Sequence, residues 1–260
     1  MGIQTLFSNC LRIALILAIG FNVSIAQKIQ FEGIIYKVTS PNTVEVTKGK
    51  YKGEIVIPSQ IFVNKRVYSI TGIGYMAFDN CLDLNSVTLG SSVAVIEERA
   101  FSRCSNLKQV IIPSSVKIIK NYSFFACSSL DSIFLPNSIT EIGVAAFNNC
   151  NNLKSINLPN SIKMIKNHAF YGCTALEAIS IPNSINSINN SLFNGCTSLS
   201  IIELPETINS IGNNAFSNCT QLQSIQIPAF VESIGNNAFS GCLNLTSIEF
   251  HCINPPRLGK

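Results

Sequence analysis

Residues 150–172 read CNNLKSINLPNSIKMIKNHAFYG, and this 23-residue unit decides the fold because it recurs along most of the chain. Cysteine marks the period. Eight of the ten Cys residues stand 23 residues apart, at positions 81, 104, 127, 150, 173, 196, 219 and 242. Leu follows each of these residues by three positions and Phe precedes each by three. This constant spacing of bulky apolar residues indicates a solenoid, in which equivalent side chains of successive turns stack into parallel ladders.

Each unit contains a segment of the form Leu-x-x-Ile-x-Leu-Pro, whose alternation of apolar and polar residues is typical of a half-buried strand. Pro ends the segment because it has no N–H to donate to a ladder. We therefore predict one parallel strand per turn, near residues 86–89, 109–112, 132–135 and onward at the same interval. The Ser-Ile-x-x-Ile segment then predicts a short second strand, and Ala-Phe-x-x-Cys favours one tight helical turn, on the convex side of the solenoid.

The full pattern, L-x-x-I-x-L-P-x-S-I-x-x-I-x-x-x-A-F-x-x-C, resembles the BspA-like leucine-rich repeats, with 23-residue units of the Treponema type, of bacterial secreted and surface proteins. The resemblance covers residues 78–250 and implies a β-rich leucine-rich-repeat solenoid of about eight repeats, one for each repeat Cys. Residues 27–77 resemble the N-terminal cap of that family, with a hairpin-like insert around Asn64 and Lys65. Residues 251–260 are then a short C-terminal cap or tail.

The first 26 residues have the pattern of a secretory signal peptide, with one Arg12, an apolar run and a cleavage site near Ala26. The apolar stretch is interrupted at Gly20, Asn22 and Ser24, so it is shorter than the roughly 20 residues that a spanning helix needs. An uncleaved anchor is the alternative. We expect a secreted or cell-surface protein whose mature chain is not inserted in a membrane.

Composition argues against nucleic acid and against an enzyme. Charged residues make up 12% of the chain, the net charge is +4, and no run of Lys or Arg could follow a phosphate backbone. Asp occurs only at three positions and His only at His168 and His251, which leaves few groups for acid–base or nucleophilic chemistry. No nucleotide, zinc-protease or serine-hydrolase motif is present. We therefore predict no catalytic residue, no cofactor and no metal.

The cysteine column allows three interpretations: buried free thiols, a chain of disulfides, or a ladder of metal ligands. Zinc sites use Cys pairs separated by about two to four residues, and stacked parallel side chains do not point toward each other as a disulfide requires. We therefore predict that at least seven of the eight repeat Cys residues are reduced and buried as small apolar groups. A disulfide between Cys242 and Cys252 is a separate alternative.

The candidate binding site lies on the outer face of the strand ladder. Residues five and seven after each repeat Cys must point outward, because those at six and eight point into the core. Most are polar, but Ile111 and Phe134 occupy the same outward position in consecutive turns, about 5 Å apart. Gln109 and Ser132 flank them, and Ile201 lies further along the same face. The competing interpretation is ordinary scattered surface hydrophobes.

These features favour a non-enzymatic module for protein binding or adhesion. By resemblance, host extracellular-matrix or surface proteins are candidate ligands. A structural or assembly protein of the cell envelope is the alternative, with end-to-end stacking through the short C-terminal cap. If the strand face does not bind, the aromatic residues Tyr122, Phe125 and Tyr171 on the convex loops are the alternative site.

Overall fold

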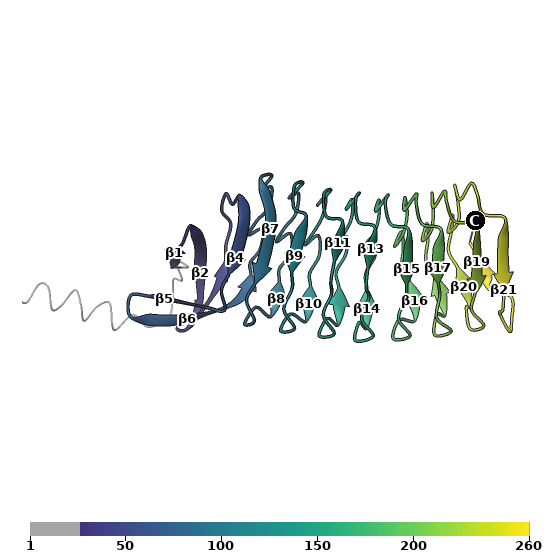
Figure 1. Ribbon diagram of the computed structural model, residues 1–260. Coiled ribbons are helices and arrows are strands. Elements are labelled where there is room, and N and C mark those ends of the chain that lie inside the picture. Colours follow the sequence, from purple (N-terminus) through teal and green to yellow (C-terminus); the bar gives the residue numbers. More distant parts are fainter. Residues whose placement is uncertain (1–26, 260) are drawn as a thin grey trace, which may run out of the picture.

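The computed structural model describes residues 27–259, which form a solenoid whose coils stack along one axis (Figure 1). We name each coil by its repeat cysteine, so that the Cys150 coil is residues 150–172. Residues 27–259 contain no helix, and therefore no helical segment long and apolar enough to span a bilayer. The expected signal peptide, residues 1–26, lies outside the described residues.

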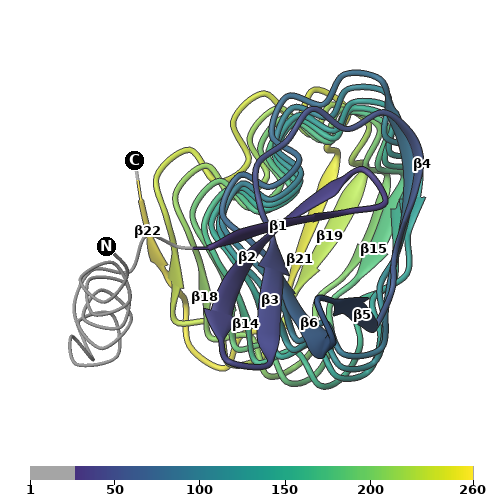
Figure 2. The same cartoon turned by 90° about the vertical axis from the view of Figure 1, so that its left-hand side faces the viewer.

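One strand from each coil forms a first strand column, on the right in Figure 2. The prediction of one parallel strand per turn is confirmed. Paired residues are one repeat apart in the sequence, as Ser132 pairs with Ser155 and Ile133 with Ile156. The repeat strands of this column are β7 (Leu84–Leu89), β9 (Gln109–Ile111), β11 (Ser132–Ile133), β13 (Ser155–Ile156), β15 (Ala178–Ser180), β17 (Ile201–Glu203), β19 (Ser224–Ile227) and β21 (Ser247–Phe250).

Some of these strands are shorter than predicted, and β11 shows why. It was expected over residues 132–135 but ends at Ile133. The side chain of Asn157, in the next coil, takes over both backbone groups of Leu135: its Nδ2 donates to the Leu135 carbonyl at 3.2 Å, and its Oδ1 accepts from the Leu135 N–H at 3.1 Å. A side-chain amide therefore replaces the last rung of the ladder.

A second strand column runs along the other side of the coils and confirms the predicted short second strand. Glu141 pairs with Met164 and Ile142 with Ile165, again in parallel and in register. Its repeat strands are β8 (Val95–Ile96), β10 (Ile118–Ile119), β12 (Glu141–Ile142), β14 (Met164–Ile165), β16 (Ser187–Ile188), β18 (Ser210–Ile211), β20 (Ser233–Ile234) and β22 (Arg257–Leu258). The last of these lies in the expected C-terminal tail. The Ala-Phe-x-x-Cys segments form hydrogen-bonded turns.

Before the first repeat, the chain forms β1 (Lys28–Phe31), β2 (Ile34–Ser40) and β3 (Thr43–Val46), which pair antiparallel in that order. β5 (Gln60–Val63) and β6 (Arg66–Ile73) form a hairpin that turns at Asn64 and Lys65, both with positive φ. β3 also pairs in parallel with β6, and β4 (Gly53–Ile57) pairs in parallel with β7. Both strand columns therefore begin ahead of Cys81.

The phenylalanines form a continuous stack through the core. The rings of Phe124 and Phe147 lie 5.2 Å apart and 1° from parallel, and the same arrangement continues from Phe78 to Phe239 at 4.9 to 5.7 Å. Tyr51 contacts Phe78 at 4.8 Å and extends the stack into the N-terminal region. Burying each such ring contributes about 1.5 to 3 kcal/mol, so neighbouring coils depend on one another for stability.

Hydroxyl groups form a second ladder just beneath the surface. Ser138 Oγ donates to the Val116 carbonyl at 2.6 Å, and Ser161 Oγ donates to the Ile139 carbonyl at 2.7 Å. Ser or Thr continues this pattern up to Thr207. Phe230 stands at the next position and is exposed, so the ladder ends there.

Candidate functional site

The strand face, defined here as the outward residues five and seven after each repeat Cys, carries the predicted apolar spot. Ile111 lies on β9 and Phe134 directly follows β11, and these strands are neighbours in the first column (Figure 1). Their side chains are 51% and 69% exposed, although both are large and apolar. Gln109 and Ser132, which flank them, are exposed as well. The structure therefore brings these four predicted residues together on adjacent coils.

Val56 belongs to the same row and was missed by the sequence analysis. It lies on β4, where it pairs with Thr88, and Thr88 in turn pairs with Ile111. Its side chain is 69% exposed. Val56 precedes the first repeat Cys, so its direction cannot be read from the distance to a repeat Cys. Only the alternation of inward and outward side chains along Gly53–Ile57 could have indicated that this Val points outward. The row thus reads Val56, Thr88, Ile111, Phe134 from the N-terminal side.

Ile201 is not part of this spot. It lies on β17, is 61% exposed and pairs with Ala178. Its coil is the third after that of Phe134, which corresponds to about 14 Å at the spacing of neighbouring strands. It also stands five residues after its Cys, whereas Ile111 and Phe134 stand seven after theirs. The strand face therefore carries two separate apolar positions, one around Phe134 and one at Ile201.

The alternative aromatic residues on the convex loops lie in two separate pairs. The Tyr122 and Phe125 rings meet edge to face at 6.0 Å, and the Arg99 guanidinium lies 5.3 Å from the centre of the Tyr122 ring. Tyr171 instead contacts His168, also at 6.0 Å, two coils further along. Tyr122 and Phe125 are only partly exposed. The three aromatic residues therefore do not form one cluster.

The cysteine column is buried and its thiols are free. Seven of the eight repeat Cys residues are buried, as predicted, and Cys242 is half-buried. Each thiol from Cys104 onward donates a hydrogen bond to the carbonyl of the Phe 26 residues earlier, as Cys127 Sγ does to the Phe101 carbonyl at 3.0 Å. Cys252 is also a free thiol and donates to the Pro228 carbonyl, so the alternative Cys242–Cys252 disulfide is not formed.

These thiols are poorly suited to nucleophilic chemistry. Burial raises the pKa of Cys127 and of Cys173 to about 12, because a thiolate would lose its hydration in the core. Within residues 27–259, no group of three or more His, Cys, Asp or Glu side chains is arranged to hold a metal ion. The column thus serves packing, with the S–H groups as hydrogen-bond donors between coils.

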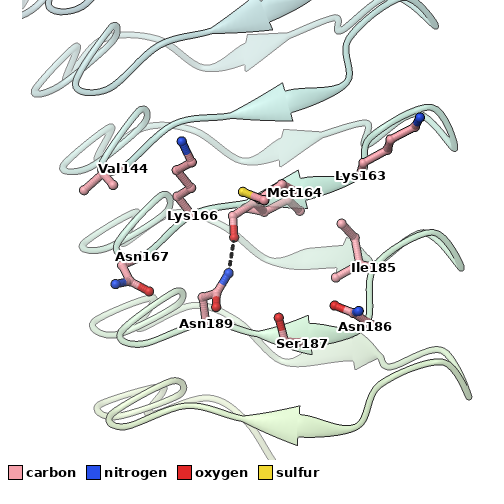
Figure 3. A pocket seen from close by; sticks show the side chains of 10 residues that line it. Val144, Lys163, Met164, Lys166, Asn167, Ile185, Asn186, Ser187 and Asn189 are labelled. Atoms are coloured by element: carbon pink, nitrogen blue, oxygen red, sulfur yellow. Dashed lines mark hydrogen bonds between the residues drawn. The ribbon is translucent and has the colours of Figure 1, made fainter.

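A hollow of about 330 Å³ opens in the second column, between β14 and β16 (Figure 3). Elsewhere in this column a backbone N–H donates to the Ile carbonyl of the preceding coil, as Lys166 does to Ile142 at 2.9 Å and Gly212 to Ile188 at 2.7 Å. At this point the side-chain Nδ2 of Asn189 donates to the Ile165 carbonyl instead. Lys163, Lys166 and amide side chains line the hollow, which offers no acid–base pair.

Comparisons with known proteins agree with this architecture. A family model described as BspA type leucine rich repeat region matches residues 57–177 and 142–254. Among solved structures, the leucine rich repeat protein TpLRR of T. pallidum is 30% identical, with 78% of this chain and 90% of that chain covered and a TM-score of 0.66. A leucine-rich repeat protein from Bacteroides ovatus ATCC 8483 is 25% identical, with 89% and 90% covered and a TM-score of 0.46.

The pneumococcal vaccine antigen PcpA shares the fold at 21% identity, with 87% of this chain and 71% of that chain covered and a TM-score of 0.65. Among curated proteins, no match was found. The fold and the repeat register are those of leucine-rich repeat proteins, and the matched ranges include every repeat Cys. The chain belongs to the BspA type leucine-rich repeat family.

Proposed function

We propose that this protein is a non-enzymatic, secreted or cell-surface module that binds another protein through its strand face. The observation that carries the proposal is the row Val56, Ile111 and Phe134, which is exposed and apolar on a face that is otherwise mostly polar. The partner is expected to present a complementary apolar side chain. By resemblance to the family, extracellular-matrix and surface proteins of a host are the candidate partners.

Ladder hydrogen bonds hold the backbone beneath Val56 and Ile111, which favours binding. β7 pairs with both β4 and β9, so Thr88 is held between Val56 and Ile111 by ladder hydrogen bonds. Val110, between the outward Gln109 and Ile111, is buried in the core. A side chain presented by an ordered strand loses little conformational entropy on binding, and a large apolar group that becomes buried contributes about 1.5 to 3 kcal/mol.

The experiment is a binding comparison on immobilised extracellular-matrix proteins. We expect the double variant Ile111→Ser/Phe134→Ser to bind about tenfold more weakly, which corresponds to about 1.4 kcal/mol. Its thermal stability should be nearly unchanged, because both side chains are mostly exposed. Leu243→Ser is the matched control, since Leu243 is 82% exposed but lies outside the strand face. Binding that is equal in all three proteins would exclude the strand face.

Secretion is part of the same proposal and has its own test. It is supported by the apolar run and the small residues before position 26. N-terminal sequencing of the protein recovered from culture medium or from the cell surface should give Gln27 as the first residue. Protein found only inside the cell, with Met1 retained, would contradict it.

A further inference from the structure

Charge is distributed unevenly along the solenoid. Residues 103–166 contain seven Lys and Arg residues and two acidic ones, whereas residues 167–256 contain five Glu and no Lys or Arg. The change of sign falls at the boundary between the Cys150 and Cys173 coils. As groups, the Cys104, Cys127 and Cys150 coils are therefore basic, and the coils from Cys173 onward are acidic.

The change of sign is sharpest beside the strand face, at the residues four after each repeat Cys. Lys154 holds this position in the Cys150 coil and Glu177 holds it in the Cys173 coil, and both are exposed. Other basic residues of the first half are already neutralised within the chain, Lys120 by Glu97 at 2.7 Å and Lys166 by Glu141. Lys154 and Glu177 stand side by side on adjacent coils, where the Glu177 N–H donates to the Lys154 carbonyl at 3.3 Å, and among the described residues neither side chain has an ion pair at or below 4.0 Å.

We propose that the strand face binds a second copy of this chain, antiparallel, about a twofold axis that passes between the Cys150 and Cys173 coils. An antiparallel arrangement places the basic Cys104, Cys127 and Cys150 coils against the acidic Cys219, Cys196 and Cys173 coils, whereas a parallel one would place like charges together. About this axis the Cys150 coil of one copy faces the Cys173 coil of the other. Lys154 then lies opposite Glu177 of the second copy, and the same pair forms again on the other side of the axis.

The apolar positions lie on coils that this axis brings together. Because each coil on one side of the axis faces the coil at the same distance on its other side, the Cys127 coil faces the Cys196 coil of the second copy. Phe134 belongs to the first of these coils and Ile201 to the second. Phe134 stands seven residues after its Cys and Ile201 five after its own, so the two side chains lie diagonally across the interface, offset by about 7 Å along the strand. The axis therefore follows from the charge reversal, and it places both exposed apolar positions within the interface.

This inference rests on the proposed function, because it names a partner for the same face. The test is the oligomeric state of the purified protein, measured by sedimentation velocity over a range of concentrations. We expect a reversible dimer that weakens with added salt. Lys154→Glu alone and Glu177→Lys alone each place like charges at both contacts, so each should raise the dimer dissociation constant about tenfold or more.

Mixing the two single variants provides the decisive arm. In a mixed dimer, Glu at position 154 of one copy faces Lys at position 177 of the other, and the reciprocal contact keeps its native Lys154 and Glu177. An equimolar mixture should therefore dimerise although neither variant does so alone. Contacts within one chain cannot produce this result, because they are not altered by mixing.

Ile201→Glu gives a second test, since it places a further acidic charge inside the interface and should also yield monomers. Circular dichroism spectra that match those of the unchanged protein establish that each variant is folded. A protein that stays monomeric at all concentrations, or dimers that persist in the single variants and in Ile201→Glu, would overturn the inference. Monomeric protein that still binds matrix proteins through Ile111 and Phe134 would leave the proposed function intact.

Discussion

At the scale of single residues, the repeat cysteine combines two properties that the coil needs. Its side chain is small and apolar enough to stack on the equivalent Cys of the next coil. Its S–H donates to a Phe carbonyl of the neighbouring coil, as Cys150 Sγ does to the Phe124 carbonyl at 3.1 Å. A thiolate could not donate this bond. The neutral thiol is therefore the form that the folded core stabilises, because burial raises the pKa of these groups.

The raised pKa values predict that stability falls in alkali. A thiol ionises near pH 8.5 in the unfolded chain, whereas the pKa of Cys127 and Cys173 is about 12 in the fold. The neutral thiols thus contribute stability that is complete below about pH 8.5 and is lost as the pH rises toward about 12. Denaturant unfolding under reducing conditions should show this fall. Between about pH 7 and pH 10, the free energy of unfolding of Cys127→Ala should fall by about 2 kcal/mol less than that of the unchanged protein. An equal fall in both proteins would contradict the burial of this thiol.

Two residues in each coil adopt a left-handed backbone, one five before the repeat Cys and one directly before it. Asn or Gly holds the second position in most coils, but Ala126 holds it at φ 56° in one. This conformation costs an L-residue other than Gly or Asn about 1 to 2 kcal/mol. Ala126→Gly should therefore raise the free energy of unfolding by about 1 kcal/mol. Ala178→Gly, on strand β15, is the control and should lower it; a loss of stability in both would contradict the prediction.

At the scale of elements, the second strand column is interrupted once between β8 and β22. β14 ends one sheet and β16 begins the next. The cause is a single residue. Other coils carry Gly, Lys or Glu at this position, and the backbone N–H of that residue donates to the preceding Ile carbonyl; Asn189 uses its side-chain amide for that carbonyl instead. The first column is also unpaired between β13 and β15, as it is between β9 and β11 and between β17 and β19.

This interruption predicts a local difference in hydrogen exchange. The Asn189 backbone amide should exchange faster than the equivalent amides of Lys166 and Gly212, which donate to carbonyls of the preceding coils. Asn189→Gly should slow exchange at that position, because the backbone is then free to pair as it does at Gly212. Mass spectrometry of peptides from the native protein measures both effects. Equal protection at all three positions would show that the column is continuous in solution.

Most of the fold could be predicted because one period governs it. With Leu84, Cys81 and Phe78 in a constant register through the following units, the strand, the turn and the stacked core are specified together. Ile111 and Phe134 were predictable for the same reason, since the register states which side chains point outward. Val56 was not, because it precedes the first repeat Cys and lies on β4, which joins the column only through its pairing with β7.

The break at Asn189 and the shortened β11 could not be predicted either. Both depend on whether a side-chain amide or a backbone group reaches a given carbonyl, and the repeat pattern does not determine that choice. For Ile201, the repeat register predicts that the side chain points outward. It does not predict the distance from Ile201 to Phe134, which depends on how the coils stack.

At the scale of the whole molecule, the protein is a rod whose strand face changes character along its length. Most of its large exposed apolar side chains lie in the N-terminal half, at Val56, Ile111 and Phe134, whereas the C-terminal half is acidic and carries Ile201 alone as a large apolar residue at an outward position of this face. The core ladders run through nearly all of it without a break, so this face is presented by one continuous scaffold. The function of the molecule is therefore expected to depend on which side chains line that face more than on any movement of the coils.

A photo-cross-linking comparison tests the central claim, that the strand face is the binding surface, most directly. A photoreactive phenylalanine analogue replaces Phe134 on the strand face in one protein and Tyr171 on the convex loops in another, and both are irradiated while bound to the same matrix proteins. We expect covalent adducts from position 134 and few or none from position 171. Adducts from position 171 alone would contradict it and would place the binding surface on the convex loops.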